Sequence, residues 1–253
     1  MEGKYALELI EKGKRIDGRK FGEFRPIQLN VGVIQTAEGS AWVKFGETEV
    51  IAGVKMGIGE PFSDTPNEGV LMVGAEFTPL ASPDFEAGPP GENAVELARV
   101  VDRGIRESNA IDLEKLVITA GEKVWLVFID IHIINHQGNL LDAAALASVA
   151  ALLNTKMPKR KDDEILRGEV DKDLPVKFKP ITITIGKVND NYIIDPNFEE
   201  EAILDARLSI AVRDDDKVCA LQKQGIKELS FEEVEEFVKS AMKKSKELRK
   251  LLE

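Results

Sequence analysis

The segment at residues 123–134 (KVWLVFIDIHII) constrains the fold of this chain more than any other. It is strongly apolar and rich in the β-branched and aromatic residues that favour a strand. A strand of this kind needs neighbours that shield it from water, so we expect it in the middle of a sheet. After a turn at residues 137–139, the stretch at 142–153 is rich in alanine and predicts a helix.

Further strands before and after this segment predict two modules. Their apolar residues alternate with polar ones or flank short turns, as expected for strands and hairpins. Each group of strands accompanies helices, and the last helix opens with the capping box Ser230-Phe231-Glu232-Glu233. We therefore expect an α+β fold made of two related strand-rich modules packed with helices. The other predicted strands are 27–33, 41–45, 49–55, 70–77, 115–119, 181–185, 191–194, 202–212 and 217–222, and the other predicted helices are 4–12 and 91–109.

Residues 158–178 separate the two predicted modules. They are dense in charge and contain Pro158, Gly168 and Pro175, which interrupt regular structure. We therefore expect an N-terminal arm and first module over residues 1–157, a charged crossover or linker over 158–178, and a second module over 179–253.

The balance of charges bears on the kind of partner. The chain has 253 residues and a formal net charge of −11. Phosphate groups need local positive charge, so an acidic chain that binds nucleic acid must gather cations in a patch or obtain them from a partner. The acidity can equally serve solubility alone. Charge by itself does not decide between these interpretations.

Cysteine usage and the N-terminal residues indicate a compartment. The single Cys219 leaves no partner for an intrachain disulfide and fits a reducing environment. The first fourteen residues are charged and amphipathic, unlike a signal peptide. No apolar run reaches the roughly 18 residues that a membrane span requires. We therefore expect a soluble, cytoplasmic protein without a membrane partner.

Common motifs of enzymes and of metal sites do not occur in the sequence. It has no P-loop, no CxxC pair and no GxSxG. His132 and His136 are four residues apart, but they fall on a strand end and a turn, where this spacing does not direct two imidazoles to one metal. We expect Asp130 and His132 to form a structural polar pair, and we expect neither a metal nor a cofactor.

The predicted helix at 91–109 has a charged stripe along one side when its residues are placed about 100° apart. In one interpretation the stripe is a solvated face, with weak pairs between Glu96 and Arg99 and between Glu96 and Arg103. In the other, its arginines bind successive phosphates through their forked guanidinium donors. Spacing alone favours the solvated face. The stripe contains Glu92, Glu96, Arg99, Arg103 and Arg106.

Several motifs in combination resemble the RNase PH family. They lie in the N-terminal arm, in the first hairpin and at the turn before the alanine-rich helix. Together they extend over most of the chain, and the resemblance implies an RNase PH-type fold. The motifs are RIDGR at 15–19, RPI at 25–27, GSAWV at 39–43, GETEVIA at 46–52 and GNLLDAA at 138–144.

Two more segments, PFSDTPNEG at 61–69 and GENAVELARVVDR at 91–103, are similar to the archaeal exosome ring subunit that lacks the phosphorolytic site. This resemblance implies a hexameric ring of three heterodimers formed with a homologous catalytic subunit. Such a ring threads single-stranded RNA through a central channel and degrades it from 3′ to 5′. Phosphate is the attacking group, and nucleoside diphosphates are released. RNA-binding cap subunits are expected as further partners.

The turn at 138–142 differs from the turn of the active relatives. A glycine turn that leads from a strand into a helix is a natural anion site, and the active relatives place hydroxyl and arginine residues there. This chain has Leu140, Leu141 and Asp142 instead. Leucine side chains offer no donors, and we expect Asp142 to cap the helix and repel phosphate. The resemblance therefore implies that the chain has no catalytic residue.

A second difference falls on the predicted strand at 202–212, where the active relatives have an acidic residue. Arg207 takes that place, although Asp205 lies two positions away on the same face. A catalytic role for Asp205 therefore stays open.

The resemblance also changes the interpretation of the arginine stripe. In the family, the non-catalytic subunit lends arginines to RNA bound at its partner's site. This role applies most directly to Arg99 and Arg103, and less directly to Arg106. Three hypotheses remain: a non-catalytic subunit that binds RNA and completes a partner's site, a self-sufficient phosphorolytic exoribonuclease, and a purely structural ring subunit.

Overall fold

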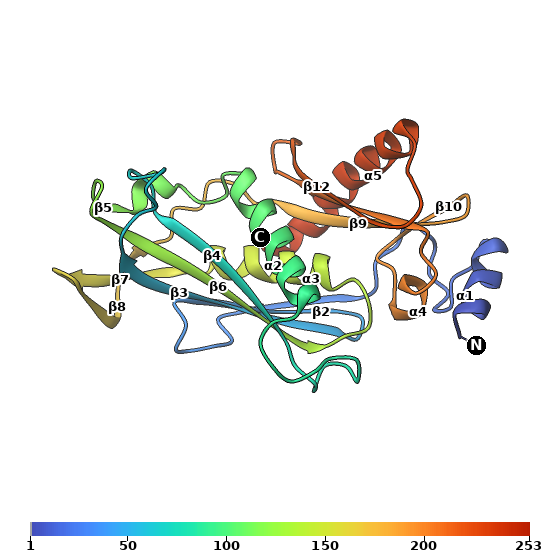
Figure 1. The fold of residues 1–253 in the computed structure, drawn as a ribbon, viewed down its shortest axis with the longest axis horizontal. Helices are drawn as coiled ribbons and strands as arrows, with labels where there is room; N and C mark the ends of the chain where they lie inside the picture. Colours follow the sequence, from blue (N-terminus) through green and yellow to red (C-terminus); the bar gives the residue numbers. More distant parts are fainter. Residues whose placement is uncertain (1) are drawn as a thin grey trace.

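The computed structural model describes residues 2–253 and has an α+β fold with two main sheets (Figure 1). The first sheet has the strand order β1-β2-β3-β6-β4, and β5 pairs with the start of β6. Its strands pair antiparallel except β4, which runs parallel to β6. They are β1 (Ile27–Val31), β2 (Gly39–Phe45), β3 (Thr48–Gly59), β4 (Val70–Phe77), β5 (Val117–Thr119) and β6 (Lys123–Asn135).

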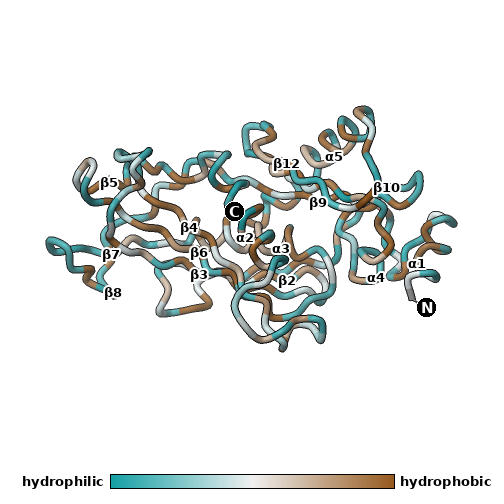
Figure 2. Tube along the Cα trace, viewed as in Figure 1, coloured by the Kyte–Doolittle hydropathy of each residue, from teal (hydrophilic) through white to brown (hydrophobic). Residues whose placement is uncertain are grey.

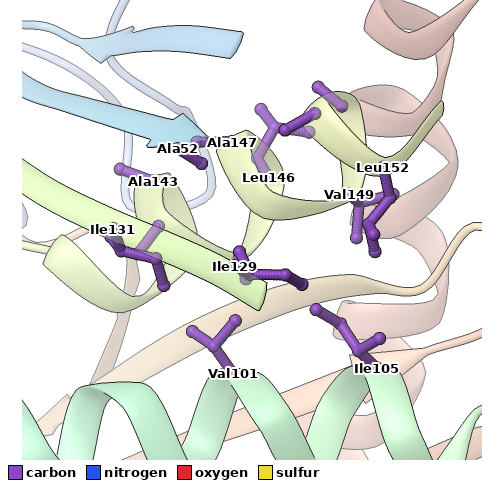
Figure 3. Close-up of a cluster of buried hydrophobic side chains, with 14 of the residues drawn as sticks. Ala52, Val101, Ile105, Ile129, Ile131, Ala143, Leu146, Ala147, Val149 and Leu152 are labelled. Carbon is purple, nitrogen blue, oxygen red and sulfur yellow. The ribbon is translucent and has the colours of Figure 1, made fainter. Parts of the chain in front are cut away.

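Strand β6 lies inside the first sheet, as its apolar sequence predicts. It pairs with β3 on one side and with β4 on the other. Ile129 and Ile131 are fully buried. In Figure 3, Ile129 belongs to the same hydrophobic cluster as Val101 and Ile105 of α2 (Glu92–Glu107). The burial of these side chains fixes α2 against the sheet.

Helix α3 (Leu140–Leu153) is buried on almost all sides and lies between the two sheets. It contacts β2 and β3 of the first sheet, β9 (Ile181–Val188) of the second, and α2. Its sequence is apolar around the whole circumference, which a core helix requires. Small side chains allow close packing: in Figure 3, Ala143 and Ala147 lie beside Ala52 of β3.

The second sheet is antiparallel and has the order β10-β9-β11-β12. Its other strands are β10 (Asn191–Ile194), β11 (Ala206–Val212) and β12 (Val218–Gly225).

Helix α5 (Phe231–Arg249) contacts β9 and β11 of this sheet and buries Phe237 and Leu248. The predicted capping box forms at its start. The Ser230 hydroxyl accepts from the Glu233 N–H at 3.2 Å, and the Glu233 carboxylate accepts from the Ser230 N–H at 2.8 Å. The local sequence signal therefore correctly placed the beginning of this helix.

The predicted crossover at 158–178 contains regular structure. Strands β7 (Lys156–Lys161) and β8 (Glu164–Asp173) form an antiparallel hairpin at one end of the molecule (Figure 1). The pairing register shifts at Pro158, and Gly168 has a φ of +89° beside this irregularity. Proline and glycine are accommodated by the bulged pairing, so they do not stop the hairpin here. Its charge is explained by exposure, since most side chains of β8 are exposed.

One hydrophobic core extends through both main sheets. It includes Ile131 of β6, Leu146 of α3, Ile183 of β9 and Ile210 of β11. Figure 2 shows hydrophobic residues along β3, β6 and α3, and hydrophilic ones at the outer turn of the β7–β8 hairpin. Because the packing is continuous, the module boundaries at residues 157 and 179 stay a prediction.

The remaining differences from the predicted elements concern their ends. Helix α3 begins at Leu140, two residues earlier than predicted, and β11 begins at Ala206, four residues later. The predicted strand at 115–119 opens within a 3₁₀ helix. No helix within residues 2–253 is long and apolar enough to cross a membrane. The elements not yet named are α1 (Glu2–Glu11), η1 (Leu113–Leu116), α4 (Phe198–Glu201) and η2 (Lys250–Leu252).

Candidate nucleic-acid interface and adjoining pocket

A pocket with a cavity volume of about 190 Å³ lies where α2, the turn before α3 and the second sheet meet. Helix α2 forms one wall, and β9, β11 and β12 form another. The polar and helix-start residues that line it are Asn93 and Glu96 of α2, His136, Asn139, Leu140 and Leu141 at the start of α3, Thr184, Glu201, Arg207, Ser209 and Gln224.

Two residues with positive φ shape the turn that leads into α3. Gly138 has a φ of +89°, and Asn139, the N-cap, has a φ of 51°. A Cβ at position 138 would lie 2.5 Å from the carbonyl carbon of Asn197 and 2.6 Å from the nitrogen of Phe198. Glycine is therefore required here, because the turn presses directly against the backbone that leads into α4.

The start of α3 presents free backbone donors to the pocket. Within residues 2–253, no hydrogen bond is formed by the N–H groups of Leu140, Leu141 or Asp142. The first N–H groups of a helix have no acceptor inside it and form the positive end of its dipole. The leucine side chains add no donors, but the backbone leaves a positive helix end beside the pocket.

Asp142 is not the cap of α3, which corrects our expectation from the sequence. It is the third residue of the helix, and its side chain is buried. The carboxylate accepts from the Thr184 N–H at 2.8 Å, the Thr184 hydroxyl at 2.7 Å and the Asn139 amide at 3.0 Å. Burial raises the pKa of Asp142 to about 7 despite these bonds. Asp142 therefore ties α3 to β9 and is not a permanent charge that repels phosphate.

Glu201 instead brings a carboxylate to the start of α3. Its Oε1 accepts from the Asn139 N–H at 3.0 Å and from Nη1 of Arg207 at 2.8 Å. The side chain is 17% exposed, and burial raises the pKa of Glu201. Arg207 also donates to Gln224. The positive charge of Arg207 is thus already neutralised inside the pocket.

Asp195 joins the N-terminal arm to the turn before α3. It is fully buried and receives two side-chain hydrogen bonds from Arg25, at 2.7 and 2.9 Å, and one from Asn139 at 2.9 Å. Arg19 donates to it at 3.1 Å. Burial alone would raise the pKa of Asp195, but hydrogen bonds and charge from Arg25 hold it below its usual value. The carboxylate is therefore ionised and held by two guanidinium groups.

Arg15 of the RIDGR motif fixes α4 in place. Its Nε donates to Glu200 at 2.8 Å, and both side chains are fully buried. Glu200 also forms a capping box with Asn197, which starts α4. This short helix is thereby anchored, and Glu201 follows directly within it. The structure gives the motif a positioning role beneath the pocket.

Asp205 lies away from this pocket. It precedes β11, pairs with Lys227 at 2.9 Å and accepts from the Asn189 N–H at 2.8 Å. Arg207 lines the pocket, whereas Asp205 borders a separate surface hollow with Lys187 and Lys227. The expectation that Asp205 and Arg207 lie on one face of the strand is wrong, because Asp205 belongs to the turn before β11.

Arg99 and Arg103 lie one helical turn apart on α2, and both are exposed. They border a groove together with Glu96 and Gln222. Neither guanidinium forms an ion pair or hydrogen bond within residues 2–253. The pairs expected with Glu96 are not formed. Oε1 of Glu96 instead accepts from Gln224 at 2.6 Å and from Gln222 at 3.4 Å.

Arg106 differs from the other two arginines of the stripe. It forms an ion pair with Asp102 at 2.7 Å and donates to the carbonyl of Leu71 at 3.0 Å. The hydrogen bonds that its guanidinium donates to Asp102 raise the pKa of Arg106. Its guanidinium therefore links α2 to β4, and a contact with RNA would compete with these bonds.

His132 lies beside a carboxylate, whereas His136 lies against an aromatic ring. Nδ1 of His132 lies 3.5 Å from a carboxylate oxygen of Glu76, and the pair expected between His132 and Asp130 is not formed. His136 stacks on Phe85 with ring centroids 5.4 Å apart, and burial lowers its pKa. Among the residues that the structure describes, no group of acidic, histidine and cysteine side chains could hold a metal.

Sequence reasoning missed Glu201 and the network beneath it. The Asn197-x-x-Glu200 pattern is a capping box and could have revealed α4. The contacts of Asp195 join residues about 170 positions apart, such as Arg25, and no local pattern predicts them.

Comparisons with known proteins agree with this geometry. The family model for domain 1 of the 3′ exoribonuclease (RNase PH) family matches residues 23–158, and the model for domain 2 matches residues 180–244. The exosome complex component Rrp42 of Thermococcus gammatolerans is 49% identical over 250 residues, which are 97% of this chain and 92% of the relative. Rrp42 of Archaeoglobus fulgidus is 55% identical over 221 residues, which are 87% and 84% of the two chains.

Solved structures of exosome chains are also similar to this chain. A chain from the Archaeoglobus fulgidus exosome with RNA bound to the active site matches with a TM-score of 0.94 and 50% identity, covering 100% of this chain and 98% of that one. A chain of an archaeal exosome core matches with a TM-score of 0.89 and 46% identity, covering 99% and 96%. The chain therefore belongs to the 3′ exoribonuclease family of the RNase PH type.

Proposed function

We propose that this chain is a non-catalytic subunit of a hexameric exosome ring and binds single-stranded RNA beside the active site of a homologous catalytic subunit. Three copies of each subunit alternate in the ring, which carries RNA-binding cap subunits and works in the cytoplasm. The names of the curated relatives and the similar exosome chains support membership in such a complex. The partner's site performs the phosphorolytic 3′-to-5′ degradation.

The observation that carries this proposal is that Arg99 and Arg103 are exposed and unpaired within residues 2–253. Both guanidinium groups are exposed and have no acidic partner in the described part of the chain, although the net charge is −11. Unneutralised arginines one turn apart can each contact a phosphate of the same strand. Contacts to phosphate carry no base information, so binding should tolerate different sequences. Arg106 would be a weaker third contact, because Asp102 already neutralises it.

The chemistry of the pocket supports a non-catalytic role. Phosphorolysis brings a phosphate ion next to an RNA phosphodiester, so the site must hold two anions with free donors and cations. Among the described residues, Arg207 has the only guanidinium group that lines the pocket. This group is already paired with the carboxylate of Glu201. The hydroxyl groups of Thr184 and Ser209 are engaged with each other at 2.8 Å. The pocket therefore offers few free groups to an attacking phosphate.

The purified chain should release no nucleoside diphosphates from single-stranded RNA in the presence of phosphate, because Arg207 is paired with Glu201 and the Thr184 and Ser209 hydroxyls are engaged with each other. A mixture with the catalytic subunit should release them faster than that subunit alone. Chromatography of the released nucleotides measures the reaction, and light scattering confirms that the mixture forms a ring. The catalytic subunit alone is the control.

Each alternative gives a different result in this assay. Phosphate-dependent release by the purified chain would contradict the proposal and favour a self-sufficient exoribonuclease. A mass equal to the monomer in the presence of the partner would contradict assembly. If the ring forms and degrades RNA no faster than the partner alone, the chain does not help to structure its partner's site.

A further inference from the structure

The pocket at the start of α3 already contains an anion, and this anion belongs to the chain itself. We infer that the carboxylate of Glu201 occupies the phosphate position of this pocket and keeps inorganic phosphate out. The inference rests on the proposed function in one respect: phosphate is the relevant anion because the chain is placed in a phosphorolytic ring. It goes further by naming the residue that closes the pocket.

The donors that hold Glu201 are those that commonly bind phosphate. One is the backbone N–H of Asn139 at the N-cap of α3, 3.0 Å from Oε1, and the other is the guanidinium of Arg207 at 2.8 Å. The free N–H groups of Leu140 and Leu141 follow within the same helix end. A helix start together with an arginine suits a tetrahedral oxyanion as well as a carboxylate.

Glu201 cannot easily move away from these donors. It is the last residue of α4, and the residue before it, Glu200, is fully buried in its ion pair with Arg15. The Asn197 capping box holds the same helix from its other end. Both anchors precede Glu201, and they hold in place the short helix that carries it. A competing anion would have to displace a carboxylate that is attached to a rigid support.

The other acidic groups near the pocket have hydrogen-bond partners of their own. Asp195 is held by Arg25 and Arg19, and the Glu96 carboxylate accepts from two glutamine amides. Asp142 is bonded to Thr184 and Asn139 and lies beneath the surface of the pocket. Removal of the Glu201 charge would leave Arg207 without its ion-pair partner beside the helix end.

Glu201→Gln tests the inference, because glutamine keeps an oxygen that can accept from Asn139 and Arg207 but removes the charge. Thermal unfolding is measured in inorganic phosphate and in chloride at equal ionic strength, and ³¹P NMR line widths report binding directly. Phosphate at about ten times its dissociation constant should raise the unfolding midpoint of Glu201→Gln by roughly 3 °C relative to chloride. Wild-type protein should show no such difference. Glu199→Gln, on the same helix, is the matched control and should behave like wild type.

Two further variants decide whether the site is the one described. Glu201→Ala also removes the charge and should gain the phosphate effect, which covers the case that the glutamine variant folds poorly. Glu201→Gln combined with Arg207→Gln should lose the effect. Equal phosphate responses of wild type and both Glu201 variants would overturn the inference, as would a response that persists without Arg207 or occurs in Glu199→Gln. Nucleotide release by wild type would instead overturn the proposed function, so the two failures are distinguishable.

Discussion

Asp195→Ala should lower the free energy of unfolding by about 3–5 kcal/mol, because it removes one partner of a buried ion pair. Arg25 is 7% exposed and would lose both of its side-chain bonds to the carboxylate as well as the one from its backbone N–H. Asn139 would lose an acceptor as well. Urea denaturation followed by circular dichroism measures the change. The N-terminal arm and the turn before α3 meet at this carboxylate. Its loss should therefore destabilise the contact between these two segments.

Asp163→Ala is the control for this change. Asp163 pairs with Lys123 on the surface, and its side chain is 66% exposed. An exposed pair contributes little, so this variant should stay within about 1 kcal/mol of wild type. A loss below about 1 kcal/mol for Asp195→Ala would contradict the account, because the arginines could then find other acceptors.

Asp142→Asn should have the second-largest effect, and the effect should depend on pH. The folded chain keeps the Asp142 proton up to about pH 7, whereas an unfolded aspartate loses it near 3.8. The folded state therefore binds more protons within this window, and its free energy of unfolding falls as pH rises through it. Above the pKa that Asp142 has in the folded chain, the free energy of unfolding stops falling for this reason. Asparagine has no proton to lose and resembles the protonated acid, since its amide can donate to Thr184.

The measured quantity is the difference in unfolding free energy between Asp142→Asn and wild type. It should shift in favour of the variant by about 3 kcal/mol between about pH 5 and about pH 8, because one pKa unit corresponds to about 1.4 kcal/mol. Asp163→Asn should show a nearly constant difference over the same range. A difference for Asp142→Asn that does not change with pH would mean that the carboxyl is already ionised in the folded chain at about pH 5.

The order of the strands and helices could largely be predicted from local patterns. The apolar run of β6 predicted a central strand, and the mostly apolar segment at 70–77 was predicted as a strand with the ends that β4 has. The capping box at Ser230 predicted the start of α5. Such signals are local, since they depend on the chemistry of residues within one or two turns of each other.

The hairpin at β7–β8 and the site could not be predicted in the same way. Pro158 and Gly168 indicate a break unless their bulged pairing is known. Asp142 resembled a helix cap because acidic residues favour that position, but the helix starts earlier and buries the side chain. The contact between Glu201 and Asn139 joins segments 62 residues apart, so only the folded chain brings the carboxylate to the helix end.

The most direct test of the proposed function measures RNA binding by assembled rings over a series of salt concentrations. Rings with wild-type subunits are compared with rings that contain Arg99→Glu and Arg103→Glu. The control contains Lys243→Glu and Lys250→Glu, which change the net charge equally at exposed lysines at the C-terminal end of the chain. Light scattering shows that each ring is intact.

If both arginines contact phosphates, the substitutions weaken binding and lower the salt slope by about 1.4, or roughly 0.7 for each lost contact. Degradation by the partner's site should slow as well, and the lysine control should bind like wild type. Equal affinity and equal slope for wild-type and arginine-substituted rings, with both rings intact, would contradict the account. The arginines of α2 would then be an exposed face without a role in RNA binding, and the chain a purely structural ring subunit.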